Sequence, residues 1–225
     1  MTVIDDLLRE IEAAVSSRSM NYSSASAACD IYEGYVFGIV LRAAAAAGGV
    51  ISFRDVHGFA PTRLAFRTSP GMLHSQVHAY TYAVLSFADC DPLEVHVGVR
   101  VQGRSRVLHE CDVVVLPVEE ADLSRTRQVA PRGYKCLLAV ECKYYASHLS
   151  LHLARGFHGL HSDLGLPHPF FVANIRAARV ERYLSHHKRT WENEVLPGSQ
   201  EANYVEGLFR EAFKKHIAVR GMLTP

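Results

Sequence analysis

The sequence has few cysteines, a single tryptophan and no excess of charge of either sign. Its five cysteines are odd in number and include no CxxC pair, which argues against a disulfide framework and against a zinc ribbon. The 13 histidines form neither an HExxH motif nor a cluster with cysteine, so a structural zinc site is not expected. The formal net charge of +1 argues against nonspecific coating of a polyanion, although a local basic groove stays possible because net charge averages over all faces.

Long apolar runs are also missing. The longest, residues 35–49, is interrupted by Arg42 and is shorter than the about 20 residues that a bilayer-spanning helix needs. The first 17 residues are acidic where a secretory signal would be basic. No P-loop of the helicase type, zinc finger, helix-turn-helix signature or internal repeat is found. We therefore expect a cytoplasmic protein with no membrane association.

The length of 225 residues predicts a single domain, 1–225, with additions at both ends. An amphipathic helix is expected over residues 2–17, because apolar side chains recur at helical spacing and Thr2 and Asp5 stand in capping-box positions. A second, more apolar helix is expected over residues 25–47, directly before two glycines.

A β-rich region follows the second expected helix. Strands are expected at residues 63–68, 79–87, 93–103, 106–116 and 136–145. Alternation in the third of these puts four valines on one face, namely Val95, Val97, Val99 and Val101. The polar, Pro/Gly-punctuated segment 117–135 predicts a long excursion between two neighbouring strands.

The last third of the chain returns to helical patterns. A helix is expected over about 147–165 with Ser147 as its N-cap, then a short strand over 169–174. The remainder, 175–220, reads as a helical extension that carries much of the basic charge. The order predicts an α/β protein with a mixed central sheet flanked by helices.

Two of the expected strands contain charged residues within apolar runs. The stretch "HECDVVVL" (109–116) contains Glu110 and Asp112, and "LLAVECKYY" (137–145) contains Glu141 and Lys143. Because side chains alternate across a sheet, each pair shares a face, and neighbouring strands would bring all four together. Carboxylates held that close repel, so one takes up a proton unless a cation lies between them. Mg²⁺ suits such a place, because it binds one or two carboxylates together with waters and phosphate oxygens.

Asp112 followed by Glu141-Cys142-Lys143 resembles the PD-(D/E)xK nuclease superfamily, which has the restriction-endonuclease-like fold. The "VECK" stretch is similar to Holliday-junction resolvases and Mrr-type endonucleases. Cys111 stands where the nominal signature has proline, a position that often departs from proline in the superfamily. The polar excursion explains the long separation between the two parts of the motif. The resemblance covers about residues 30–174, which leaves both terminal regions outside it.

The resemblance implies a role for each matching residue. Asp112 and Glu141 would ligate Mg²⁺, with Mn²⁺ as a substitute, helped by the backbone carbonyl of Cys142. Lys143 would position the attacking water and stabilise charge. Such nucleases usually carry a further glutamate on a helix ahead of the sheet. Glu33 is the candidate here, for a second metal or a metal-bound water, because it shares a helical face with apolar residues.

The implied function is a Mg²⁺-dependent DNA endonuclease that leaves a 5′-phosphate and a 3′-hydroxyl. Superfamily members often act as homodimers, and specificity would come from the protein's own loops or from a protein partner. The sequence does not choose between duplex, branched and single-stranded DNA, nor does it exclude RNA or an exonuclease. Defence and recombination or repair both stay open as pathways. The alternatives are a nucleic-acid-binding or assembly subunit that cleaves little or not at all, and an unrelated α/β protein.

Each candidate residue also has an ordinary interpretation. Exposed strands often alternate Glu and Lys, so Glu141 and Lys143 need not be functional, and Asp112 could cap a turn. Glu33 could pair with an arginine at the rim of the protein, and Glu110 could be a ligand or a solvated neighbour.

Two groups of basic residues also have two possible interpretations. Phosphate contacts and ordinary solvation are the alternatives for the helix face with His148, His152 and Arg155. The same alternatives hold for the basic segment that contains Arg176, Arg179, Arg182, Lys188 and Arg189.

Overall fold

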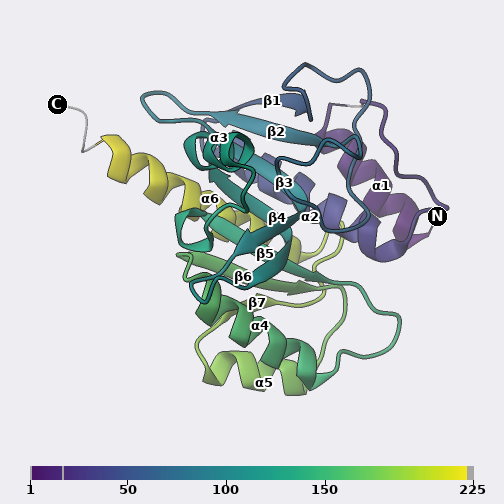
Figure 1. Cartoon of the computed structure of the whole chain (residues 1–225). Helices are drawn as coiled ribbons and strands as arrows, with labels where there is room; N and C mark the ends of the chain where they lie inside the picture. The colour runs from purple at the N-terminus through teal and green to yellow at the C-terminus, as the bar shows by residue number, and fades with distance from the viewer. Residues whose placement is uncertain (1, 17, 222–225) are drawn as a thin grey trace.

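The computed structural model describes residues 2–16 and 18–221 and has a mixed α/β architecture, with helices on both faces of one seven-stranded sheet (Figure 1). Its strands are β1 (Val50–Asp55), β2 (Thr81–Ser86), β3 (Leu93–Gln102), β4 (Leu108–Pro117), β5 (Leu138–Lys143), β6 (His168–Ala173) and β7 (Thr190–Glu192). They lie side by side in chain order, antiparallel from β1 to β5 and parallel from β5 to β7. The expected mixed sheet between helices is confirmed.

The helices form a layer on each face of this sheet. The main core lies under α1 (Val3–Ala14), α2 (Ala28–Ala46) and α6 (Gln200–Gly221), which share apolar contacts with β2, β3, β4, β5 and β6. Two smaller clusters lie on the other face, where α3 (Val118–Arg127), α4 (Leu151–Leu164) and α5 (Ala178–His186) pack. No helix within the described ranges is both long enough and apolar enough to cross a bilayer.

The first helix begins as its sequence predicts. The Thr2 hydroxyl accepts a hydrogen bond from the Asp5 amide, and the Asp5 carboxylate accepts one from the Thr2 amide, which satisfies two amides that the first helical turn leaves free. Leu7 and Ile11 are fully buried against α2. The helix ends at Ala14, and the far end of the expected range, Ser17, lies outside the described residues.

The strand expected at residues 63–68 is wrong. In that segment Leu64 forms only an isolated bridge to Met20. Side chains, and not a neighbouring strand, form hydrogen bonds with the backbone of the next two residues. The Asn21 side chain bonds both the amide and the carbonyl of Phe66, and the Thr81 hydroxyl bonds both backbone groups of Ala65. The first strand of the sheet is instead β1, directly after the glycines that end α2, which the sequence analysis missed.

The prediction that four valines of β3 share a face is also wrong. Val95 and Val97 lie in the main core under α2, whereas Val99 and Val101 lie in the cluster with residues of α4 on the opposite face. Gly98 between them has a φ of +61°, a left-handed conformation that interrupts the alternation of the strand. The register with β4 is unchanged on either side of this glycine, so the strand turns over without an inserted residue.

Three further boundaries differ from the sequence predictions. The segment 117–135 does connect neighbouring strands, but it contains α3 and a short 3₁₀ turn at Gly133–Lys135. The N-cap of α4 is Ser150 and not Ser147. The region 175–220 is mainly helical, with β7 as an unexpected third parallel strand. Its last helix packs on α2 and buries Phe209 and Phe213, so it contributes to the main core.

Candidate active site

The charged residues of β4 and β5 lie where these two strands separate. The ladder between the strands includes the pairs Val113–Val140 and Val115–Leu138, and it ends at the first of them. Beyond that point Asp112 Oδ2 accepts a hydrogen bond of 2.6 Å from the Cys142 amide. The side chain of Asp112 therefore replaces the backbone acceptor that β4 no longer offers. The end of β5 pairs with β6 alone.

Lys143 connects the two carboxylates that the sequence places in the site. Its Nζ lies 2.7 Å from Glu141 Oε1 and 3.4 Å from Asp112 Oδ2. All three side chains are largely shielded, with exposed fractions of 18% for Lys143, 20% for Glu141 and 9% for Asp112. The predicted meeting of Asp112, Glu141 and Lys143 is thus present in the structure.

Two further carboxylates lie close enough to influence this centre. Glu33 is half-buried in the second turn of α2, on the helix face whose apolar members are buried in the main core. Glu110 is exposed on β4, two residues before Asp112. We call Glu33, Asp112, Glu141 and Lys143, with Glu110 at its border, the acidic centre.

The acidic centre has more negative charge than it can balance. Burial first, and then the charges of Asp112, Asp30 and Glu110, raise the pKa of Glu33 to about 9, although the charge of Lys143 lowers it. Burial also raises the pKa of Asp112, and burial together with the charge of Asp112 raises that of Glu141. Burial alone would lower the pKa of Lys143, but the two carboxylates outweigh it and raise the pKa, so the ammonium keeps its proton.

The metal-binding capacity of the centre is limited to few side chains. Across residues 2–16 and 18–221, no three His, Cys, Asp or Glu side chains come together as a set that could hold a metal ion. Glu33, Asp112 and Glu141 are therefore not assembled as a three-carboxylate site. Asp112 and Glu141 share the ammonium of Lys143, and the thiol of Cys142 is buried in the main core, which leaves its backbone carbonyl as the group that the sequence analysis considered.

One residue that positions the site was missed by the sequence analysis. Asn174 follows β6, and its side chain bonds both the amide and the carbonyl of Tyr145, at 2.8 and 2.9 Å, while its own amide bonds the carbonyl of Lys143. These three bonds fix the backbone directly after Lys143. The available signal was an asparagine at the end of a buried parallel strand, the edge where functional side chains collect in α/β sheets.

Within the described residues, the basic residues suggested for phosphate contacts form no hydrogen bond or ion pair with the acidic centre. His148, His152 and Arg155 are exposed, and the two histidine rings bond to nearby serines of the α4 N-terminus. In the following region Arg176 bonds Glu181, and Arg189 contacts the ring of His161.

The chain matches no family model, no curated protein and no solved structure. The class that the fold defines is a mixed α/β protein with a seven-stranded sheet between helices. The function must therefore be argued from the acidic centre itself.

Proposed function

We propose that this protein is a Mg²⁺-dependent nuclease with a restriction-endonuclease-like core, acting on DNA as an endonuclease and leaving 5′-phosphate ends. The single observation that carries the proposal is the placement of Lys143 against Asp112 and Glu141 where β4 and β5 separate. Two carboxylates from adjacent strands and one ammonium, all largely shielded from water, suit phosphodiester hydrolysis, because they can hold a cation and stabilise the charge of the transition state.

The charge of the acidic centre supports a divalent cation as cofactor. Buried carboxylates with raised pKa values are stabilised by added positive charge, and one ammonium does not supply enough of it. Asp112, Glu141 and the carbonyl of Cys142 are the oxygen donors that would hold Mg²⁺ or Mn²⁺, in keeping with the one or two carboxylates that Mg²⁺ commonly takes from a protein. When bound, the ion would add positive charge at the phosphate and lower the pKa of a bound water.

The chain's own groups have separable roles in this proposal. Lys143 keeps its proton, so it donates hydrogen bonds to the attacking water and offsets charge on the phosphoryl oxygens. Asp112 holds β5 in register with β4 through the Cys142 amide, so it both offers an oxygen to the cation and positions the strand. Glu33, on α2, is assigned to a second metal or a metal-bound water.

The test is cleavage of plasmid and oligonucleotide substrates by purified protein in Mg²⁺ or Mn²⁺. Glu141→Gln and Lys143→Met are each expected to reduce the cleavage rate by about 10³-fold, the cost of removing one preorganised charge or donor. Glu211→Gln is the matched control, because Glu211 forms an exposed pair with Lys214 on α6. Cleavage that persists in both site variants and in chelator would reject the assigned residues.

A second candidate is a nucleic-acid-binding or assembly subunit with little or no cleavage. Two observations favour it: no three metal-binding side chains are gathered in the described part of the chain, and Lys143 already neutralises part of the acidic charge. Binding of oligonucleotides without turnover under every metal and substrate shape would select this candidate.

A further inference from the structure

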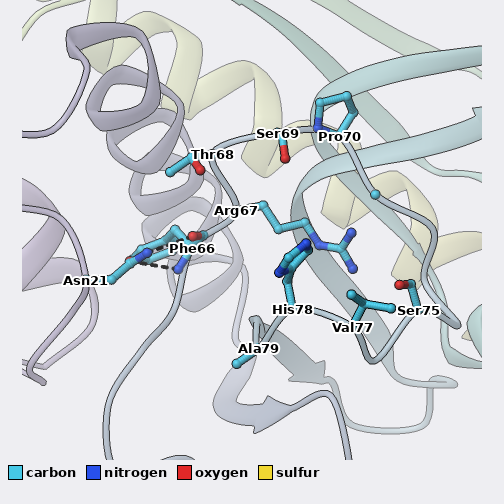
Figure 2. A pocket seen from close by; sticks show the side chains of 11 residues that line it. Asn21, Phe66, Arg67, Thr68, Ser69, Pro70, Ser75, Val77, His78 and Ala79 are labelled. Carbon is cyan, nitrogen blue, oxygen red and sulfur yellow. Dashed lines mark hydrogen bonds between the residues drawn. The ribbon is translucent and has the colours of Figure 1, made fainter.

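A cavity of about 620 Å³ lies beside the loop that joins β1 to β2 (Figure 2). It is lined by Asn21, by residues 66–71 and by Ser75, Val77, His78 and Ala79. Its volume is within the range of about 300–1,000 Å³ that is typical of small-ligand sites. We call it the loop cavity.

The loop cavity lies close to the acidic centre. Gly71 pairs with β3 beyond the end of β2: its amide donates to the Gly98 carbonyl and its carbonyl accepts from the Arg100 amide, both at 2.9 Å. On the other edge of β3, the neighbours of Gly98 pair with the residues on either side of Asp112. The loop and Asp112 are thus on opposite sides of one strand, two strand spacings or about 10 Å apart.

A second connection runs through Tyr22. Its hydroxyl donates to the carbonyl of Arg67 at 3.2 Å, and a Cβ added at Gly34 would lie 2.7 Å from its ring. Gly34 directly follows Glu33, so Tyr22 stands between the wall of the loop cavity and the helix that carries Glu33.

Arg67 supplies the charge of the loop cavity. Its guanidinium lies 3.7 Å from the centroid of the Tyr80 ring and donates to the Met72 carbonyl at 3.1 Å, while its Nε is buried without a hydrogen-bond partner. Within the described residues no carboxylate forms an ion pair with Arg67, and none lines the cavity. Any Cβ at Gly71 would overlap the guanidinium, so the absence of a side chain there leaves room for Arg67.

The remaining lining suits a phosphate joined to a larger organic group. The hydroxyls of Thr68, Ser69 and Ser75 and the ring nitrogens of His78 are hydrogen-bonding groups of the kind that contact phosphate beside arginine. Apolar lining residues, among them Pro70, Val77 and Ala79, offer contact to a sugar or a base. A free phosphate would fill only a small part of this volume.

We propose that the loop cavity binds one nucleotide of a nucleic-acid strand that runs past the acidic centre, with Arg67 on its phosphate. The assignment of the strand rests on the proposed function. Nucleotides of a B-form strand rise about 3.4 Å each along the helix axis, and successive phosphates lie further apart than this rise, so no more than about three nucleotides cover a separation of about 10 Å. The subsite thus holds the strand a few nucleotides from the phosphate at Asp112.

The test combines Arg67→Gln with oligonucleotides that carry a single uncharged methylphosphonate at successive positions. Affinity is measured by fluorescence anisotropy in EDTA, and again in Mg²⁺ with Glu141→Gln protein. We expect Arg67→Gln to weaken binding about tenfold, the effect of losing one charge-assisted hydrogen bond. A methylphosphonate at one particular position should weaken oligonucleotide binding to the wild-type protein by a similar factor. The same methylphosphonate should not weaken binding to the Arg67→Gln protein any further. Arg210→Gln on α6 is the control, whose effect should be independent of every methylphosphonate.

A second variant keeps the test independent of the buried arginine. His78→Glu adds a carboxylate at an exposed position of the cavity lining, and it should weaken binding about tenfold, with His57→Glu in the β1–β2 turn as the matched control. The subsite would be overturned if the effects of Arg67→Gln and of the methylphosphonate on affinity were additive at every position of the oligonucleotide. Equal weakening of binding by His57→Glu and His78→Glu would also overturn it.

The outcomes for the two proposals are distinguishable. Cleavage without the positional dependence on Arg67 overturns the subsite and leaves the nuclease. Positional dependence without cleavage supports the subsite in a protein that binds nucleic acid without cutting it. Absence of both binding and cleavage overturns both proposals.

Discussion

Glu94 on β3 and Asp112 on β4 are both buried carboxylates in neighbouring core strands, yet their surroundings differ. Glu94 accepts two hydrogen bonds from the Arg125 guanidinium, at 2.9 and 2.6 Å, and its Oε2 lies 2.7 Å from His96 Nε2. Burial alone would raise the pKa of Glu94, but His96 and Arg125 outweigh it and lower the pKa. At Asp112 the Cys142 amide and Lys143 do not outweigh burial, and the pKa rises.

The difference separates a carboxylate whose charge is balanced by its neighbours from one whose charge is not. The Glu94 cluster is also held by ring contacts, since Arg125 lies 4.8 Å from the centroid of the Tyr82 ring, which stacks on His96. Its carboxylate has all the positive charge that it needs. In the acidic centre two carboxylates, Asp112 and Glu141, share one ammonium, and their pKa values stay raised. It is this shortage of positive charge that a cation or a substrate group would fill. A charged residue in a core strand does not by itself indicate function; the balance of charge around it does.

The same substitution in the two clusters should give opposite results, and this is the largest stability effect that we expect. Glu94→Gln leaves Arg125 and His96 without their buried anion, so the free energy of unfolding should fall by about 3–5 kcal/mol. Glu141→Gln removes a carboxylate that repels Asp112, so the free energy of unfolding should not fall. Urea denaturation in EDTA measures both. Equal losses in the two variants would show that the acidic centre is as well balanced as the Glu94 cluster.

Mg²⁺ should stabilise the protein through the acidic centre alone. A ligand that binds only the folded state adds about 2.7 kcal/mol at 100 times its Kd, so the melting temperature should rise when Mg²⁺ replaces EDTA. Asp112→Asn keeps an acceptor for the Cys142 amide but loses the charge, and it should abolish the rise. Glu211→Gln serves as the control. The same rise in wild-type and Asp112→Asn protein would show that the ion binds elsewhere.

The sequence predicted those parts of the fold and site that depend on periodicity. Apolar runs located most of the strands, and alternation on neighbouring strands predicted that Lys143 would meet Asp112 and Glu141. The role of Asp112 as acceptor for the Cys142 amide was not predictable, because it depends on where β4 and β5 separate, which no local pattern encodes.

The missed features have tertiary causes. Arg125 lies in a polar segment for which the sequence predicts a loop. Its ion pair with Glu94 depends on the packing of α3 against β3, which the sequence pattern does not indicate. The strand expected at 63–68 failed because side chains such as Asn21 satisfy its backbone groups. The alternation of residues in the sequence also could not predict that the valines of β3 change faces at Gly98, since glycine is compatible with both strand and left-handed conformations.

Gly98 separates the stretch of β3 that carries Glu94 from the stretch beside the loop cavity, and replacing it should have an intermediate effect. Gly98→Ala puts a side chain on a residue with φ of +61°, and its Cβ would lie 3.3 Å from the Arg67 Cβ. The free energy of unfolding should fall by about 1–2 kcal/mol. Gly207→Ala is the control, because α6 is helical there and nothing lies within 4 Å of the added Cβ, so it should be neutral or stabilising. An equal response to both substitutions in urea denaturation would contradict a special role for the left-handed turn.

Asp163, at the end of α4, is a third carboxylate, and we expect it to have the smallest effect on stability. Like Glu94 it has hydrogen-bond donors that lower its pKa, but it lies near the surface. Hydrogen bonds from the Ser105 hydroxyl, from His109 and from the Ser105 amide lower the pKa of Asp163 to about 2. Because this folded-state pKa lies below the usual 3.8, the group stabilises the fold above about pH 4, and the contribution is lost as the pH falls towards 2. Asp163→Asn should therefore be less stable than wild type at pH 6, with the gap closing as the pH falls from about 4 to 2. Urea denaturation at pH 6 and below pH 4 measures the gap. A stability difference that stays constant with pH would mean that the hydrogen bonds from Ser105 and His109 do not stabilise the ionised form of Asp163. The pKa of Asp163 would then not be lowered in the folded protein.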